Sequence, residues 1–118
     1  MINMQVKSFA IWANAEKEKV PALVQNALQW ASENNLNVHL ADRLKSISIN
    51  GDVSYFSTQN PPDVDFLLCL GGDGTLISGV RIFSNPSVPV LGVHIGGLGF
   101  LAQITPKELI DKLEAVKN

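Results

Sequence analysis

A short glycine-rich motif, G-G-D-G-T at residues 71–75, separates two apolar segments and constrains the fold more than any other feature. Residues 64–70 before the motif are almost continuously apolar, as is usual for strands buried on both faces of a parallel sheet. After the motif, apolar residues recur at the spacing of an amphipathic helix: Leu76, Ile77, Val80 and Phe83. The segment therefore predicts a strand, a glycine turn and a helix, as in α/β domains with a parallel sheet.

The rest of the chain continues this alternation. Apolar patterning predicts three further strands, at residues 6–12, 36–40 and 89–93. It also predicts a further helix at residues 20–34. The polar residues 42–60 are assigned mostly to loop. Thr105, Pro106 and Glu108 match a capping box with proline at the first helical position, which predicts that a last helix begins there. We therefore expect one α/β domain over residues 1–118, with a doubly wound, mainly parallel sheet.

Composition argues against several classes of function. The net charge of −2 and the pI near 5.5 leave no basic stripe for a nucleic-acid backbone, so we expect no nucleic-acid partner. No apolar run approaches the roughly 20 residues that cross a bilayer, and residues 1–5 do not resemble a signal peptide. We therefore expect a cytoplasmic protein with no membrane partner. Cys69, the only cysteine, lies in an apolar run, which predicts a buried thiol and argues against disulfides and cysteine-based metal sites.

Two glycine-rich loops, at residues 71–75 and 92–101, each follow a predicted strand. Ligands of open parallel sheets bind beyond the carboxyl ends of the strands, so both loops should lie on one rim of the sheet. The first loop contains three glycines, Gly71, Gly72 and Gly74. Because glycine lacks a β-carbon, a phosphate can approach the backbone N–H groups of this loop and the positive end of the next helix. Asp73 is unexpected in a phosphate cradle unless it binds a cation, orients a sugar hydroxyl or accepts a proton. Thr75 either caps the helix or binds a phosphate oxygen.

Simpler interpretations of these residues stay open. The G-G-D-G-T motif can be only a tight turn, with Asp73 capping the helix. Residues 97–102 loosely match the dinucleotide fingerprint, and Asp42 could be the ribose-binding acid, but residues 12–15 form no glycine loop, which disfavours an ordinary dehydrogenase. Arg81 either reaches a phosphate or stays solvated. We expect the other notable side chains to be structural, with a partly exposed His39 and aromatic rings in the core: Trp12, Trp30 and Phe83.

The pairing of two motifs resembles the NAD kinase family. These motifs are G-G-D-G-T-L at residues 71–76 and P-V-L-G-V-H-I-G-G-L-G-F-L at residues 89–101. Diacylglycerol and sphingosine kinases carry a motif similar to the first, and 6-phosphofructokinases carry G-G-D-G-S, so the G-x-x-x-G-x-L-G-F-L segment is the more selective part. The resemblance covers residues 64–113 well, and earlier residues only in their order of strands and helices.

The resemblance implies a Rossmann-like, phosphofructokinase-like fold and transfer of the ATP γ-phosphate to the 2′-hydroxyl of the adenosine ribose of NAD, giving NADP. Asp73 matches the family aspartate that engages this ribose and takes the hydroxyl proton, and Gly74 would lie against the same nucleotide. Gly71, Gly72 and Thr75 would help to hold phosphates, whose charge Mg²⁺ offsets; no residue is assigned as a metal ligand. The donor is ATP or inorganic polyphosphate. The nucleotide site would also be lined by Leu98, Gly99 and Phe100.

This sequence departs from the family pattern in several places. His94 stands where the family usually has asparagine, and Gly97 where it has a larger or polar residue. Family members continue into a β-rich C-terminal domain that binds NAD, so we interpret residues 1–118 as the N-terminal nucleotide-binding domain and expect it to be inactive alone. The family is commonly dimeric or tetrameric, which implies a homo-oligomer. Two rival functions stay open, a diacylglycerol-type lipid kinase and a non-catalytic nucleotide-binding or assembly module.

Overall fold

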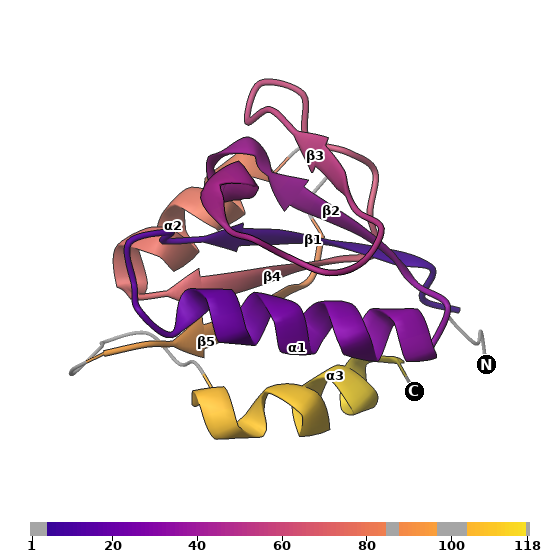
Figure 1. Ribbon diagram of the computed structural model, residues 1–118. Coiled ribbons are helices and arrows are strands. Elements are labelled where there is room, and N and C mark those ends of the chain that lie inside the picture. The colour runs from indigo at the N-terminus through magenta and orange to yellow at the C-terminus, as the bar shows by residue number, and fades with distance from the viewer. Residues whose placement is uncertain (1–4, 85–87, 97–103, 118) are drawn as a thin grey trace.

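The computed structural model describes residues 5–84, 88–96 and 104–117. Its centre is a sheet of five strands in the order β3-β2-β1-β4-β5 (Figure 1). The strands are β1 (Ser8–Ala13), β2 (Asn37–Ala41), β3 (Ser54–Phe56), β4 (Phe66–Gly71) and β5 (Val90–His94). The helices are α1 (Val20–Glu33), α2 (Asp73–Ile82) and α3 (Leu109–Lys117), with 3₁₀ turns at Asp42–Ser46 and Pro106–Glu108. All four strand pairings are parallel, so the predicted α/β fold is confirmed.

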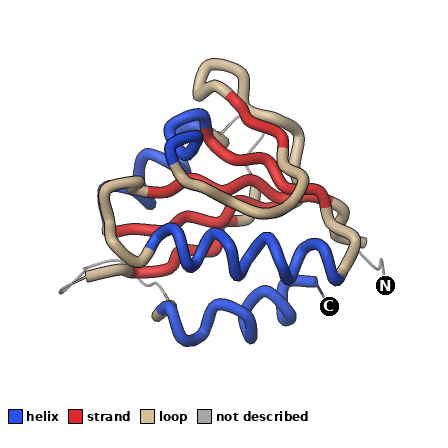
Figure 2. Tube along the Cα trace, in the orientation of Figure 1, coloured by secondary structure: helices blue, strands red, loops and turns tan. Residues whose placement is uncertain are grey.

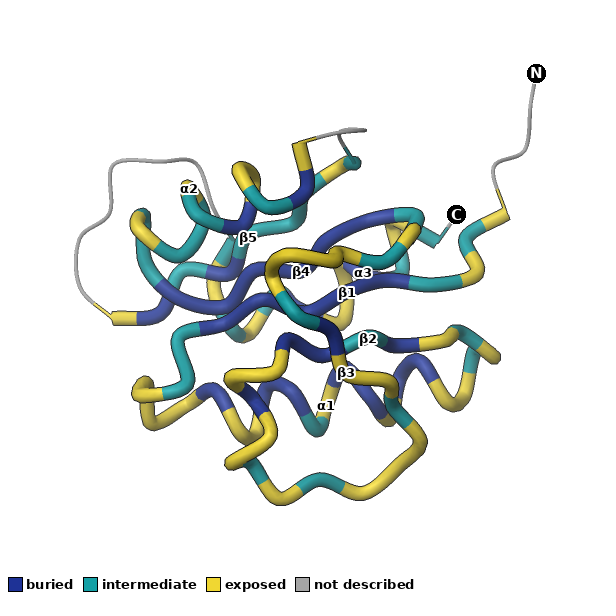
Figure 3. The backbone as a smooth tube through the Cα atoms, turned by 90° about the horizontal axis from the view of Figure 1, so that it is seen from above, coloured by how far each residue is buried: buried dark blue, intermediate teal, exposed yellow. Residues whose placement is uncertain are grey.

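Helices cover both faces of the sheet. Figure 3 shows the sheet between α2 on one side and α1 on the other, and Figure 2 shows α3 running beside α1. The adjacent strands β1 and β4 are consequently buried on both faces along almost their whole length. This double burial explains why β4 appears in the sequence as a continuous apolar run rather than as an alternating pattern.

Aromatic rings and two side-chain hydrogen bonds hold the α1 side together. Phe9 of β1 stacks on Phe66 of β4, with ring centroids 4.8 Å apart, and lies 6.1 Å from the ring of Trp30 of α1. Trp30 Nε1 donates a hydrogen bond of 2.8 Å to Glu114 Oε1 of α3. A second bond of 2.6 Å runs from the ammonium group of Lys117 to the side-chain oxygen of Asn34, just after α1. These contacts fasten α3 to α1.

The other face is packed more closely because a glycine of α2 meets the sheet. A β-carbon built at Gly79 would lie 2.5 Å from Cys69 Sγ. The same atom would lie 3.1 Å from Trp12 Cδ1 and 3.2 Å from Leu67 Cδ2. All three neighbours are buried. The helix axis therefore lies nearer to β4 than an alanine at this position would allow.

Most sequence predictions of elements are confirmed, with small shifts at their ends. The capping box is present, since the backbone N–H and the hydroxyl of Thr105 both lie 2.9 Å from Glu108 Oε1. The predicted aromatic core and the buried thiol are also confirmed, because Trp12, Trp30, Phe83 and Cys69 are buried. His39 is half-buried, as predicted.

Residues 42–60 are mostly loop, as predicted, but they also contain β3 and a 3₁₀ turn that were not predicted. β3 is short and lies at the sheet edge with Ser54 and Tyr55 exposed, so it carries no apolar pattern. Ile77 and Val80 were expected on the core face of α2, but they are 51% and 48% exposed. None of the described helices is long and apolar enough to cross a bilayer.

Candidate functional site

A crevice opens at the carboxyl ends of the strands, where the order of the sheet reverses. From β1 the chain passes to β2 and β3 on one side, and it then continues with β4 and β5 on the other. The connections that follow β1 and β4 therefore diverge, and such a switch point is the usual ligand position in open α/β sheets. A cleft of about 570 Å³ lies here, lined by Asn14, Ala15, Glu16, Arg43, Gly74, Thr75 and Ser78. A larger hollow of about 720 Å³ lies by the amino end of β2 and contains no residue of the G-G-D-G-T motif.

The G-G-D-G-T motif forms the end of β4 and the start of α2. Gly71 is the last residue of β4, and Gly72 is the N-cap of α2 in an extended conformation (φ −98°, ψ −165°). Asp73 is the first helical residue and is half-buried, and the N-cap position is held by Gly72, which has no side chain to cap the helix. Asp73 and Thr75 lie inside the helix, so neither is its N-cap residue. An uncapped helix start presents backbone N–H donors and the positive end of the dipole, which favours an anion.

The glycines of the motif differ in what the fold requires of them. A β-carbon at Gly71 would lie 2.5 Å from Thr75 Oγ1, so the Thr75 side chain closes the turn against this glycine. At Gly72 and at Gly74, a β-carbon would meet no atom of the described residues within 4 Å. Gly74 and Thr75 line the cleft, whereas Gly71, Gly72 and Asp73 form the turn beside it. Open space beside Gly74 is the cradle that a phosphate-binding turn needs.

The second glycine loop starts beside the first, as predicted. His94 of β5 is the register partner of Gly71, and the N–H of Ile95 donates a hydrogen bond of 3.0 Å to the Gly71 carbonyl. Gly96 has a φ of +107°, a backbone conformation that favours glycine. A β-carbon there would lie 3.5 Å from the ammonium group of Lys17, which follows β1. Three predicted site residues of this loop lie outside the described residues: Leu98, Gly99 and Phe100. Gly97 lies outside them as well.

Arg43 and Asn14 line the cleft but were not singled out from the sequence. Each is close to the carboxyl end of a strand, Asn14 directly after β1 and Arg43 in the 3₁₀ turn after β2. The signal that could have found them is this position, because side chains after parallel strands gather on the ligand-binding rim. The neighbouring Asp42, a possible ribose-binding acid, instead pairs with Lys45 at 3.4 Å and does not line the cleft.

The side chains around the cleft form a connected set. The guanidinium carbon of Arg43 lies 4.0 Å from the centroid of the Trp12 ring. Trp12 Nε1 donates a hydrogen bond of 2.8 Å to Ser78 Oγ, and the Ser78 hydroxyl donates one of 3.1 Å to the Thr75 carbonyl. This set links the turn after β2 to the first turns of α2. Arg81, in contrast, is exposed in the last turn of α2 and does not line the cleft.

The buried thiol of Cys69 has no part in this chemistry. Burial raises the pKa of the Cys69 thiol to about 12, so this sulfur stays protonated at neutral pH and is a poor nucleophile. Within residues 5–84, 88–96 and 104–117, acidic, histidine and cysteine side chains form no group of three or more that could hold a metal ion. The described part of the chain thus offers binding by backbone N–H groups, hydroxyls, one guanidinium group and carboxylates.

Comparison with known proteins agrees with this arrangement. Residues 9–118 match the model of the ATP-NAD kinase N-terminal domain. The chain is 34% identical over 113 residues to an NAD kinase of Citrifermentans bemidjiense, covering 92% of this chain and 38% of that protein. It is 35% identical over 111 residues to an NAD kinase of Syntrophotalea carbinolica, covering 94% and 39%.

Among solved structures, the crystal structure of yeast NADH kinase complexed with NADH is similar in fold. It superposes with a TM-score of 0.76 at 23% sequence identity, covering 95% of this chain and 36% of the yeast chain. The chain thus spans well under half the length of the relatives it matches. Because the family model covers residues 9–118, the chain belongs to the ATP-NAD kinase N-terminal domain family.

Proposed function

We propose that the complete gene product is an NAD kinase, which transfers the γ-phosphate of ATP to the 2′-hydroxyl of the adenosine ribose of NAD to give NADP. The observation that carries this proposal is the cleft at the switch point of the sheet, lined by Gly74 and Thr75 at the uncapped start of α2. The names of the relatives supply the reaction. These relatives are longer, so residues 1–118 form one domain of the proposed enzyme, with the NAD pocket completed by a second domain.

Phosphoryl transfer needs mainly correct positioning and neutralisation of charge, together with a base that orients the acceptor. In our proposal, the N–H groups at the start of α2 and the Thr75 hydroxyl bind donor phosphates, with Gly71 and Gly72 shaping the turn. Asp73 accepts the proton of the 2′-hydroxyl while the hydroxyl oxygen forms a bond to the γ-phosphorus. The bond from this phosphorus to the bridging oxygen breaks, and ADP leaves. Gly74 and three residues of the second loop contact or support the nucleotides: Leu98, Gly99 and Phe100.

Mg²⁺ is part of this proposal. Mg²⁺ usually binds through substrate phosphates and one or two carboxylates rather than in an all-protein cage. The donor phosphates would therefore hold most of the Mg²⁺ coordination, and the ion would supply neutralisation of their charge. ATP is the proposed donor, with inorganic polyphosphate as an alternative of the same chemistry.

The remaining parts of the proposal concern the protein's surroundings. The proposed partners are small nucleotides, and the net charge of −2 argues against nucleic acid and anionic membrane surfaces. We propose a cytoplasmic homo-oligomer, either a dimer or a tetramer. Size measurement by light scattering of the complete gene product tests the oligomeric state.

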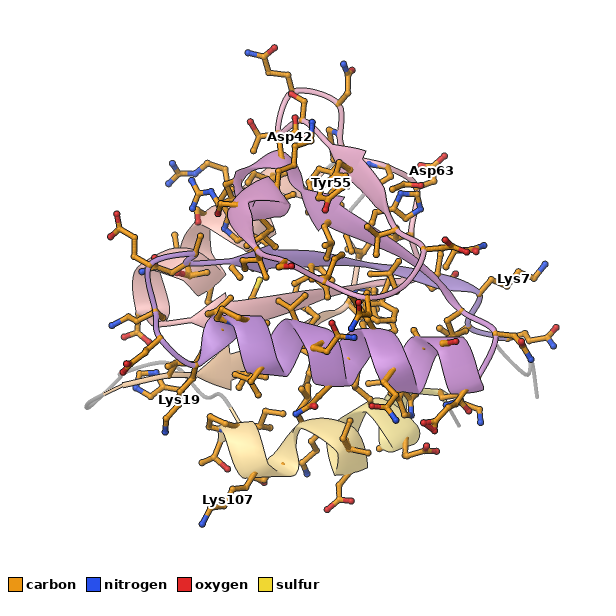
Figure 4. All side chains as sticks on the ribbon, in the orientation of Figure 1. Lys7, Lys19, Asp42, Tyr55, Asp63 and Lys107 are labelled. Atoms are coloured by element: carbon orange, nitrogen blue, oxygen red, sulfur yellow. The ribbon has the colours of Figure 1, made fainter. Side chains whose placement is uncertain are left out.

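The decisive experiment is NADP formation from NAD and Mg·ATP by the complete gene product and by Asp73→Asn. The variant keeps the side-chain shape but removes the proposed base, so we expect kcat to fall by roughly 10²- to 10⁴-fold. Asp63→Asn is the matched control, because Asp63 is exposed and precedes β4 whereas the glycine turn follows it (Figure 4). No NADP from wild type would reject the kinase assignment and favour a lipid kinase or a binding module. Equal rates for both variants would reject the role of Asp73.

A further inference from the structure

We infer that Arg43 is a binding residue for the phosphate chain of the donor in the switch-point cleft. This inference rests on the proposed function and adds a residue that lies outside both glycine motifs. Arg43 lies directly after Asp42, in the 3₁₀ turn that follows β2, whereas the motifs follow β4 and β5. The cleft brings Arg43 together with Gly74 and Thr75 of the G-G-D-G-T motif.

The backbone of Arg43 is fixed by the core below it. The next residue, Leu44, is fully buried, with 0% exposure, and so anchors the 3₁₀ turn on the sheet. Ala41, the last residue of β2, is fully buried as well. The turn therefore presents Arg43 from a rigid base, as a binding residue requires if little entropy is to be lost on binding.

The guanidinium group is also held in place. It lies 4.0 Å from the centroid of Trp12, and the Trp12 ring is buried and tied to Ser78 by a hydrogen bond of 2.8 Å. An arginine that stacks on an aromatic ring uses one face of its planar group, which leaves the N–H groups along its edge available for a bidentate contact. The stack thus orients a fork of donors whose geometry matches phosphate oxygens.

The charges of the cleft favour an anion near Arg43. Arg43 is the one cationic side chain among the described residues that line it, and the uncapped start of α2 adds a positive dipole end at Gly74 and Thr75. Across residues 5–84, 88–96 and 104–117, no carboxylate lies within ion-pair distance of the Arg43 guanidinium. Glu16, which is exposed as Arg43 is, also lines the cleft, and no ion pair joins these two side chains. A donor phosphate is the ligand group that satisfies both positive features at once.

The test compares Arg43→Gln with Lys45→Gln in the complete gene product. Lys45 is exposed, pairs with Asp42 at 3.4 Å and lies outside the cleft, so its variant removes the same charge from the same turn. We expect Arg43→Gln to raise the KM for Mg·ATP by about 10- to 100-fold, the range for loss of a hydrogen bond between charged groups, with the KM for NAD unchanged. Lys45→Gln should change the KM for Mg·ATP less than about 2-fold. Arg43→Lys should lie between wild type and Arg43→Gln.

Inorganic tripolyphosphate identifies the part of the donor that Arg43 contacts. When tripolyphosphate inhibits by competing with ATP, its inhibition constant should rise in Arg43→Gln by the same factor as the KM for Mg·ATP. An unchanged inhibition constant would show contact with adenosine and overturn the phosphate assignment, and an unchanged KM for Mg·ATP would overturn any role for Arg43. If wild type makes no NADP, the proposed function fails separately, and calorimetric titration with tripolyphosphate decides the inference. Binding by wild type that Arg43→Gln loses supports it, whereas equal binding or no binding overturns it.

Discussion

The contact between α2 and the sheet makes a sharp prediction about Gly79. This glycine is the buried residue of α2, and its missing side chain lets the helix approach β4. Alanine at this position would place a β-carbon 2.5 Å from Cys69 Sγ, closer than real β-carbons approach any atom. The two other nearby atoms, in Trp12 and Leu67, leave no alternative space, because they lie 3.1 Å and 3.2 Å away.

The expected cost follows from two opposing effects. Replacing glycine by alanine within a helix favours the helix by about 1 kcal/mol. Overpacking a core usually costs about 1–3 kcal/mol, and we expect the upper end because the neighbours are at most 3% exposed. The net loss in the free energy of unfolding is then about 2 kcal/mol, which lowers Tm by roughly 8 °C in a domain of this size.

Thermal and urea unfolding followed by circular dichroism measure this loss. Gly74→Ala is the control in the same helix, since a β-carbon there meets no atom within 4 Å in the part of the chain that the structure describes. Cys69→Ala removes the obstructing sulfur, so Gly79→Ala should cost much less in that background, with a coupling energy of about 1–2 kcal/mol. If Gly79→Ala is as stable as wild type, or if its cost is the same with and without Cys69, the close-packing argument is wrong.

Three further predictions concern single side chains. Because the pKa of Cys69 is about 12, alkylation by iodoacetamide at pH 8 should be at least roughly 10³-fold slower in the folded chain than in urea, and equal rates would contradict its burial. The hydrogen bonds from the backbone N–H and hydroxyl of Thr105 hold the pKa of Glu108 below its ordinary value of 4.5. The ionised Glu108 side chain therefore stabilises the fold fully above pH 4.5, and this stabilisation is lost as the pH falls through the lowered pKa. Glu108→Gln should lose this part of the acid dependence of Tm, and a Tm profile equal to that of wild type would refute the prediction. Trp30→Phe removes the bond to Glu114, so it should cost about 1 kcal/mol more in wild type than in a Glu114→Ala background in urea unfolding, and an equal cost in both backgrounds would mean that the bond is unimportant.

The parts of the fold that could be predicted are those whose burial leaves a pattern in the chain. β4 is buried on both faces and so forms an apolar run, and α1 is buried on one face and so shows helical spacing. β3 could not be found this way, because its position depends on pairing with β2 at the edge of the sheet. The exposure of Ile77 and Val80 was also hidden, because the core contact of α2 is made through Gly79, which contributes nothing to an apolar pattern.

The candidate site divides in the same way. The glycine turn could be predicted because its residues are contiguous in the sequence and its geometry is local. The cleft depends on the strand order, which brings Asn14 after β1 and Arg43 after β2 against the start of α2. Residues so far apart in the chain show no shared spacing, so only the structure reveals that they meet.

The contrast between Gly79 and Gly74 separates structural from functional use of glycine within one helix. At Gly74 the helical backbone accommodates alanine without a close contact to any described residue, and such a substitution ordinarily stabilises a protein by about 0.4–1 kcal/mol. The fold alone would therefore prefer alanine there, whereas a methyl group would occupy space in the cleft that the proposed nucleotide needs. We expect Gly74→Ala to raise the Tm while reducing NADP formation by the complete gene product, and Gly79→Ala to lower the Tm. Full activity in the stabilised Gly74→Ala variant would mean that the nucleotides lie elsewhere, because no ligand could then be using the open space beside the helix start.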